Sequence, residues 1–173
     1  VAVVKHFLND GELKHAVTFS IQHESNGQAG DTSRSWNYLS IRYLWLPHEK
    51  WQFGVEGRLP IGNMSDNKDL MKYKGYFLFS TAYSPHRNFI LQTDFSKAST
   101  WDWRGMIKFS AGYRLFGEGP GFLYLQYYVG NAESLSHYRK AVSNLRLGLA
   151  FVDMFGNFAK RQKDNAIRET EME

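Results

Sequence analysis

The sequence predicts an all-β fold, an antiparallel transmembrane β-barrel, and three observations support this prediction. From residue 13 to residue 152, apolar and polar side chains alternate in segments of roughly ten residues that turns or polar loops separate. These segments are longer than an ordinary strand of about five or six residues, and they suit a tilted membrane crossing. Aromatic residues form 16% of the 173 residues and include 10 Tyr and 5 Trp, which favour the two interfaces of a membrane.

The alternation predicts about eight strands. Their expected ranges are 13–25, 35–46, 51–61, 73–84, 89–97, 103–115, 121–130 and 142–152. Each strand has one apolar face and one polar face, and in the first strand Phe19 and Ile21 oppose Ser20 and Gln22. The connections alternate between short turns and long loops, except for a short loop at 98–102. This alternation is typical of barrels with short periplasmic turns and long outer loops.

The same alternation also fits a soluble β-barrel or sandwich, which would turn its apolar face inward and bind a small apolar ligand. No uninterrupted apolar run approaches about 18 residues, which excludes a transmembrane helix but not a barrel. The net charge of +4 is modest and the basic residues are scattered, which argues against a nucleic-acid partner. The chain has no cysteine, so neither a disulfide framework nor a cysteine metal site is possible.

We expect one domain, a β-barrel over residues 1–155, followed by a polar C-terminal tail over residues 156–173 that lies outside the barrel. The sequence starts at Val1 without a basic segment or an apolar signal region. Either processing has removed a signal, or the sequence begins inside its gene.

Three polar residues share the apolar face of the first two predicted strands. His23 and Ser25 are two residues apart, so they project to the same side with Cα atoms about 7 Å apart. If Ser25 and Ser35 pair across the loop, the antiparallel register places Asn37 opposite His23, at about 4.5 to 5.5 Å. The sequence therefore predicts a cluster of a nucleophile, a base and an orienting group.

These residue types can carry out ester hydrolysis. His23 would take the Ser25 hydroxyl proton as a general base, and the side-chain oxygen of Asn37 would accept the other imidazole N–H. A neutral amide in the third position suits a lipid interface, where a buried carboxylate would carry a large desolvation cost. The alternative is that His23, Ser25 and Asn37 are ordinary polar residues at the rim of a barrel or porin without catalytic activity.

The sequence around this cluster resembles the active-site signature of the outer-membrane phospholipase A family. Residues 23–27 read His-Glu-Ser-Asn-Gly, residues 32–37 read Thr-Ser-Arg-Ser-Trp-Asn, and the fourteen-residue spacing from histidine to asparagine has no gap. The segments 62–67, 72–76 and 133–135 are also similar to this family. The resemblance spans roughly residues 13 to 155, and the first motif is its most specific part.

The resemblance implies a calcium-dependent phospholipase that cleaves acyl esters of membrane phospholipids, with Ser25, His23 and Asn37 as its triad. It implies calcium ligands at the Gln28 backbone carbonyl, the Ser33 hydroxyl and Asp66, and oxygen ligands of this kind suit a hard cation. Asp31 stands one position later than the acidic residue of the family pattern, and we expect it to be a loop residue.

The resemblance further implies a location in the bacterial outer membrane and a homodimer that is needed for activity. The family barrel has about twelve strands. We expect this sequence to supply about eight of them, beginning at the strand of His23 and lacking the four before it.

Overall fold

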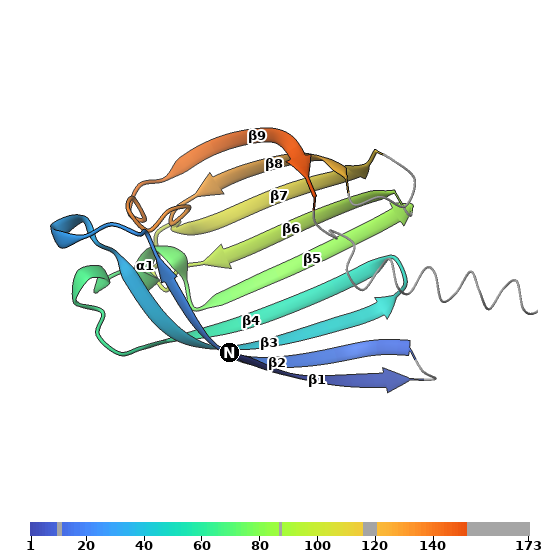
Figure 1. The fold of residues 1–173 in the computed structure, drawn as a ribbon, viewed down its shortest axis with the longest axis horizontal. Coiled ribbons are helices and arrows are strands. Elements are labelled where there is room, and N and C mark those ends of the chain that lie inside the picture. The colour runs from blue at the N-terminus through green and yellow to red at the C-terminus, as the bar shows by residue number, and fades with distance from the viewer. Residues whose placement is uncertain (10–11, 87, 116–120, 152–173) are drawn as a thin grey trace, which may run out of the picture.

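The computed structural model describes residues 1–9, 12–86, 88–115 and 121–151, which form one antiparallel sheet of nine strands in chain order (Figure 1). The strands are β1 (Ala2–Asn9), β2 (Glu12–Ser25), β3 (Ser35–His48), β4 (Trp51–Ile61), β5 (Phe77–His86), β6 (Phe89–Lys97), β7 (Gly105–Arg114), β8 (Phe122–Gly130) and β9 (Val142–Ala150). Three short helices lie in the long loops, namely η1 (Gly30–Thr32), η2 (Ser65–Asn67) and α1 (Met71–Lys74). The predicted all-β antiparallel architecture is confirmed.

The predicted list of strands lacks one strand. The structure adds β1 in front of the strand that carries His23, so the sheet has nine strands rather than about eight. Its alternation is hard to read in the sequence because Val3 and Val4 are adjacent and the pairing with β2 shifts between Phe7 and Leu8. Within the described residues β1 pairs only with β2 and β9 only with β8, so the sheet is open at both edges. Figure 1 shows that the sheet is also curved. The predicted tail at 156–173 lies outside the described residues.

The fourth predicted strand, 73–84, starts too early, because residues 71–74 form the helix α1 and β5 begins only at Phe77. Met71 is buried in a cluster that includes Trp36 and Tyr38 of β3, which holds this turn of helix against the sheet. Gly75 then turns the chain with φ 77°, and a Cβ there would lie 2.5 Å from the carbonyl oxygen of Lys97. Only glycine tolerates both the dihedral angle and the close approach. The strand expected at 103–115 is also shorter and covers Gly105–Arg114.

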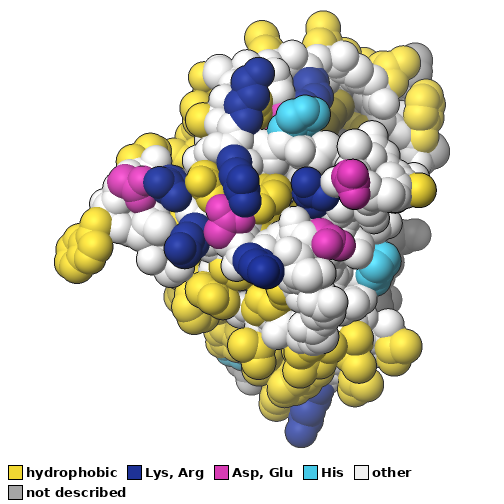
Figure 2. Space-filling model, turned by 90° about the vertical axis from the view of Figure 1, so that its left-hand side faces the viewer, with side chains coloured by type: hydrophobic (Ala, Val, Ile, Leu, Met, Phe, Trp, Pro, Cys, Tyr) yellow, Lys and Arg dark blue, Asp and Glu magenta, His cyan; other side chains and the backbone are white. Residues whose placement is uncertain are grey.

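The two faces of the sheet differ in the way that a membrane barrel requires. On the outer face, Phe19 and Ile21 are each 55% exposed, whereas the inner face buries Ser40, Glu56 and Ser110. Figure 2 views the end with the long loops, and it shows charged side chains gathered near the middle and apolar side chains around the sides. A soluble barrel would bury its apolar face, so the structure contradicts the soluble alternative and agrees with a lipid-facing outer wall.

No helix in the described ranges has the length and the apolar character that a membrane crossing requires.

A compact apolar cluster lies on the inner side of the sheet where the long loops begin, and we call it the loop-end cluster. Trp36 and Tyr38 of β3 stack with ring centroids 4.0 Å apart, and both are buried. Leu70, Met71, Leu135 and Tyr138 from the β4–β5 and β8–β9 loops complete the cluster. Segments far apart in the sequence thus pack directly behind the ends of β2 and β3, which holds these strand ends in place.

Candidate functional site

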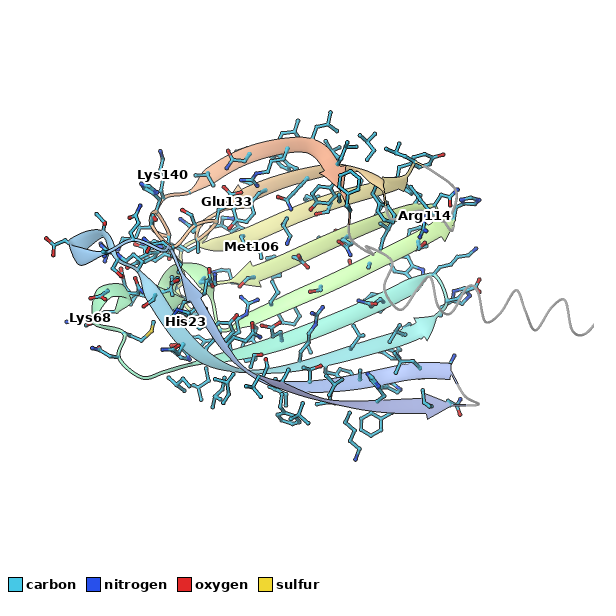
Figure 3. All side chains as sticks on the ribbon, viewed as in Figure 1. His23, Lys68, Met106, Arg114, Glu133 and Lys140 are labelled. Atoms are coloured by element: carbon cyan, nitrogen blue, oxygen red, sulfur yellow. The ribbon has the colours of Figure 1, made fainter. Side chains whose placement is uncertain are left out.

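The strands β2 and β3 pair in the predicted register. Ser25 lies opposite Ser35, and His23 lies opposite Asn37. His23, Ser25 and Asn37 are all exposed on the outer wall, because they alternate with inward-facing residues along the two strands. Figure 3 shows His23 at the end of the sheet that carries the long loops. The outer wall therefore brings the three predicted residues to one place.

A hydrogen bond joins two of the three residues. Nδ1 of His23 lies 2.8 Å from the side-chain oxygen Oδ1 of Asn37. Because an amide oxygen can only accept, Nδ1 of His23 carries the proton and donates it to this bond. In a neutral imidazole the other nitrogen, Nε2, then has a free lone pair. Asn37 thus holds the ring in the tautomer and orientation that a general base needs.

Ser25 stands beside this pair on the same wall. It is exposed and two residues from His23, which separates the two Cα atoms by about 7 Å. Within the described residues its hydroxyl makes no hydrogen bond, so it is available to a substrate. Contacts between a nucleophile and its base are often long in ligand-free structures and tighten when substrate binds. The arrangement can therefore support nucleophilic attack by Ser25 with His23 as the base.

The loop from residue 26 to residue 34 is organised by one side chain, that of Asn26. Its Oδ1 accepts hydrogen bonds from the backbone N–H of Arg34 at 3.0 Å and of Gln28 at 3.3 Å. Its Nδ2 donates to the Thr32 carbonyl at 2.8 Å and to Ser136 Oγ at 3.1 Å. Asn26 thus fixes the loop directly after Ser25 and ties it to the β8–β9 loop.

A second loop reaches the same place from β4. Nδ2 of Asn67 in η2 donates to the backbone carbonyl of Ser35 at 2.6 Å, and Ser35 is the first residue of β3. Asp66 precedes Asn67, and its carboxylate accepts a hydrogen bond from Ser65 Oγ at 3.2 Å. The chain therefore brings Asp66 to the base of the loop that follows Ser25.

The predicted calcium ligands carry oxygen donors of the kind that a hard cation such as calcium prefers. Gln28 and Ser33 lie in the loop that Asn26 organises, and Asp66 lies in the segment bound to the start of β3. The buried Oδ1 of Asn67 has no hydrogen-bond partner and is a further unsatisfied oxygen in this region. Asp31 is exposed in the first turn of η1, where its backbone carbonyl accepts a hydrogen bond from Arg34. Carboxylate, hydroxyl and carbonyl oxygens are the ligands that calcium prefers.

No group of three or more His, Cys, Asp or Glu side chains within the described ranges could hold a metal ion. The predicted calcium ligands are of a different kind, because they combine one carboxylate with a hydroxyl and a backbone carbonyl.

Sequence analysis missed the residues that support the site from the inner wall. Glu24, between His23 and Ser25, accepts hydrogen bonds from Trp36 Nε1 at 2.9 Å and from Lys74 Nζ at 3.1 Å. The ammonium group of Lys74 also lies 5.6 Å from the Trp36 ring. The alternation places Glu24 on the inner wall, but only the tertiary structure brings Lys74 to it.

A second group missed by sequence analysis joins the β4–β5 loop to the β8–β9 loop. Asp69 accepts hydrogen bonds from the hydroxyl of Tyr138 and the guanidinium of Arg139. Burial acts to raise the pKa of Asp69, but the hydrogen bonds from Arg139 and Tyr138 outweigh it and hold the pKa below its ordinary value. Burial is the main cause that raises the pKa of the Tyr138 hydroxyl, and the hydrogen bond to Asp69 raises this pKa further. We call Asp69, Tyr138 and Arg139 the loop clamp.

The fold and the site together define a class, a membrane β-barrel that carries a candidate Ser, His and Asn site on its lipid-facing wall. The model of the Phospholipase A1 family matches residues 3–151, and the chain therefore belongs to this family. The Phospholipase A1 of Proteus vulgaris is 30% identical over 151 residues, which cover 86% of this chain and 49% of that protein. The chain thus spans about half the length of the curated relatives it matches.

Solved structures agree with the family. The outer membrane phospholipase A from Escherichia coli has a TM-score of 0.77 and 27% identity, covering 89% of this chain and 58% of that chain. Its active-site mutant with an asparagine replaced by alanine gives the same TM-score. The outer membrane phospholipase dimer of Salmonella typhi with bound calcium has a TM-score of 0.76, 27% identity and the same coverage. This likeness and the apolar outer wall place the chain in the bacterial outer membrane.

Proposed function

We propose that this protein is a calcium-dependent phospholipase that hydrolyses acyl ester bonds of membrane phospholipids through Ser25, His23 and Asn37. The observation that carries the proposal is the hydrogen bond of 2.8 Å between His23 and Asn37 on the lipid-facing wall beside Ser25. Membership of the Phospholipase A1 family supports it. An active site that faces the membrane meets its substrate where the substrate resides.

The proposed reaction has two steps. Nε2 of His23 takes the proton from the Ser25 hydroxyl while Oγ attacks the ester carbonyl carbon, and the protonated imidazole then gives this proton to the leaving alcohol. An acyl group remains on Ser25. In the second step Nε2 takes a proton from water, the water oxygen attacks the acyl carbon, and the fatty acid leaves while the proton returns to Ser25. Asn37 keeps the ring oriented throughout.

Calcium is the proposed cofactor, and the Gln28 carbonyl, the Ser33 hydroxyl and the Asp66 carboxylate are the proposed ligands. When bound next to the serine, the ion would supply positive charge that stabilises the negative oxygen formed during attack, an effect worth several kcal/mol. Asn26 orients the loop that carries Gln28 and Ser33. The calcium-bound structure of the Salmonella typhi relative supports this choice of ion.

The homodimer is the proposed active form. The Salmonella typhi relative was solved as a dimer with bound calcium. In detergent, we expect calcium to raise the dimer fraction of the full-length protein and its rate of fatty-acid release together.

The test is the calcium-dependent release of fatty acid from phospholipid in mixed micelles by the full-length protein. We expect Ser25→Ala to lower this rate by about 10³-fold or more. Ser35→Ala is the matched control, because Ser35 pairs with Ser25 and its contact with Asn67 uses the backbone carbonyl. We expect the Ser35→Ala control to keep its activity. We expect a calcium chelator to abolish the activity of the wild-type protein. A Ser25→Ala protein as active as the wild type would contradict the proposal.

A further inference from the structure

The β8–β9 loop, residues 131–141, contacts both of the loops that carry the proposed calcium ligands. Oγ of Ser136 accepts a hydrogen bond from Nδ2 of Asn26 at 3.1 Å, although the two residues are 110 positions apart in the sequence. The loop clamp joins the same β8–β9 loop to the β4–β5 loop. One loop therefore links two others that the sequence keeps apart.

Packing and hydrogen bonds hold the backbone around Ser136 in place. Leu135 and Tyr138, on either side of Ser136, are only 5% and 4% exposed and belong to the loop-end cluster. The backbone N–H of Ala132 donates to the carbonyl of Tyr138 at 3.0 Å, which closes the loop on itself. The side chain of Ser136 is exposed, so a fixed backbone presents its hydroxyl to the neighbouring loop.

The loop that follows Ser25 lacks such packing. None of the residues 26–34 is buried, and η1 buries no side chain. The other hydrogen bonds of the Asn26 side chain stay inside this loop. Across the described ranges, the bond from Asn26 to Ser136 is the one hydrogen bond that ties residues 26–34 to another loop. Without it, the loop could keep its internal bonds and still shift as a unit.

The proposed calcium ligands are divided between two loops. Gln28 and Ser33 lie in the loop after Ser25, whereas Asp66 lies in the β4–β5 loop. An ion that binds both loops needs their oxygen atoms at a fixed separation, and its affinity falls when binding must first order them. Residues that orient metal ligands without touching the metal typically change metal affinity by about 10- to 100-fold.

We propose that Ser136 is a positioning residue that sets the calcium affinity of the candidate site, by fixing the loop after Ser25 relative to the β4–β5 loop. This inference rests on the proposed function, in which calcium is the cofactor. Ser136 acts through Asn26, which in turn orients the loop that carries Gln28 and Ser33.

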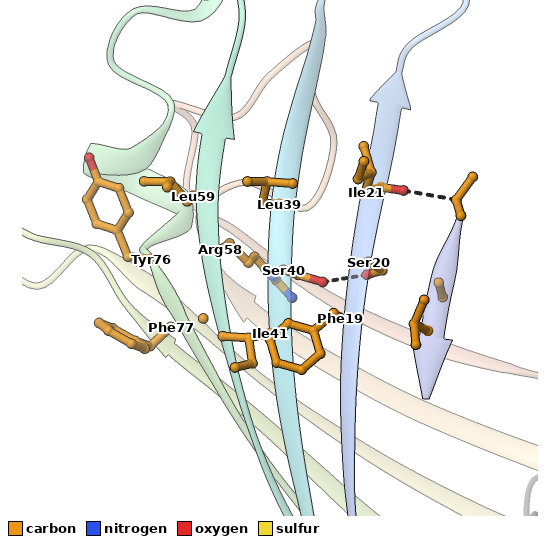
Figure 4. Close-up of a pocket in the computed structure, with 14 residues that line it drawn as sticks. Phe19, Ser20, Ile21, Leu39, Ser40, Ile41, Arg58, Leu59, Tyr76 and Phe77 are labelled. Atoms are coloured by element: carbon orange, nitrogen blue, oxygen red, sulfur yellow. Dashed lines mark hydrogen bonds between the residues drawn. The ribbon is translucent and has the colours of Figure 1, made fainter. Parts of the chain in front are cut away.

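The hollow in the outer wall that Figure 4 shows is separate from Ser136. This hollow of about 710 Å³ lies over β2, β3 and β4. Among the described residues, every one that lines it falls between Val1 and Phe77, so the β8–β9 loop takes no part in it. Because Ser136 contributes nothing to this lipid-facing surface, its loss should change the response to calcium and leave the KM for phospholipid unchanged.

The test measures calcium binding to the full-length protein in detergent by isothermal titration calorimetry, and fatty-acid release over a range of calcium concentrations. We expect Ser136→Ala to raise the Kd for calcium, and the calcium concentration for half-maximal activity, about tenfold. The rate at saturating calcium and the thermal unfolding midpoint should keep their wild-type values. Ser136→Thr should bind calcium as the wild type does, because it retains a hydroxyl that can accept the bond from Asn26.

Ser134→Ala is the matched control. Ser134 is an exposed serine of the same loop, and its hydroxyl makes no hydrogen bond within the described residues. We expect this variant to keep the wild-type Kd. An unchanged Kd in Ser136→Ala, or an equal increase in Ser134→Ala, would overturn the role of Ser136 alone. A wild-type protein that binds no calcium would overturn the proposed cofactor and this inference with it.

Discussion

The outer and inner walls of β2 and β3 differ sharply at the loop end, although they are built from alternate residues of the same two strands. On the outer wall, His23, Ser25 and Asn37 are exposed, and the one hydrogen bond among them is that from His23 to Asn37. On the inner wall, Glu24 binds both Trp36 and Lys74, and Trp36 is buried in the loop-end cluster.

This difference separates two tasks. A side chain exposed to lipid cannot hold its own position through packing, because few protein atoms surround it. The inner wall fixes the backbone instead, and alternation then projects His23 and Ser25 outward from a rigid strand. Ser96 adds to this support, since its hydroxyl donates to the Lys74 carbonyl at 2.6 Å and holds the end of α1. The candidate catalytic side chains are thus exposed, whereas the contacts that fix their backbone lie on the inner wall.

The largest expected effect comes from the outer wall. We expect His23→Ala to lower the rate of phospholipid hydrolysis by about 10³-fold or more without changing the thermal unfolding midpoint. His15→Ala is the matched control, because His15 lies on the same wall of β2 and hydrogen bonds to the Tyr43 hydroxyl at 2.7 Å. Equal rate losses in the two variants would show that His23 has no special role.

A substitution on the inner wall should mainly lower the stability of the protein. We expect Trp36→Ala to lower the free energy of unfolding by about 3 to 5 kcal/mol, because it removes a buried aromatic side chain and one of the two donors to Glu24. Denaturant unfolding of the full-length protein in detergent measures this loss. Trp101→Ala is the control, since Trp101 is fully exposed and should change stability little. Similar unfolding curves for the two variants would contradict the division between the walls.

The smallest effect belongs to the loop clamp, and it depends on pH. The pKa of Asp69 is held below its ordinary value of 3.8, so the stabilisation is complete above that value and disappears as the pH falls through the lower pKa of the folded protein. We expect Asp69→Asn to lower the thermal midpoint at neutral pH, and the difference from the wild type to vanish in strong acid. A difference that is constant over the whole pH range would contradict an ionic role for Asp69.

Much of the site was predictable because it is local. Residues 23 to 37 form one hairpin, and two-residue periodicity together with the pairing of Ser25 and Ser35 gives the facing positions of His23 and Asn37. The support of the site was not predictable in this way. Lys74 contacts Glu24 from 50 residues further along the chain, and Tyr138 contacts Asp69 across 69 residues. No periodicity relates such positions.

The sequence by itself determined the all-β class, the alternation of faces and the register of the two strands that carry His23, Ser25 and Asn37, because strand geometry depends on neighbouring residues and on turn length. Only the tertiary structure decided that residues 71–74 are helical, that β1 extends the sheet and that Lys74 reaches Glu24 behind the site. These features depend on burial and on neighbours across strands, which come together only when the whole sheet forms.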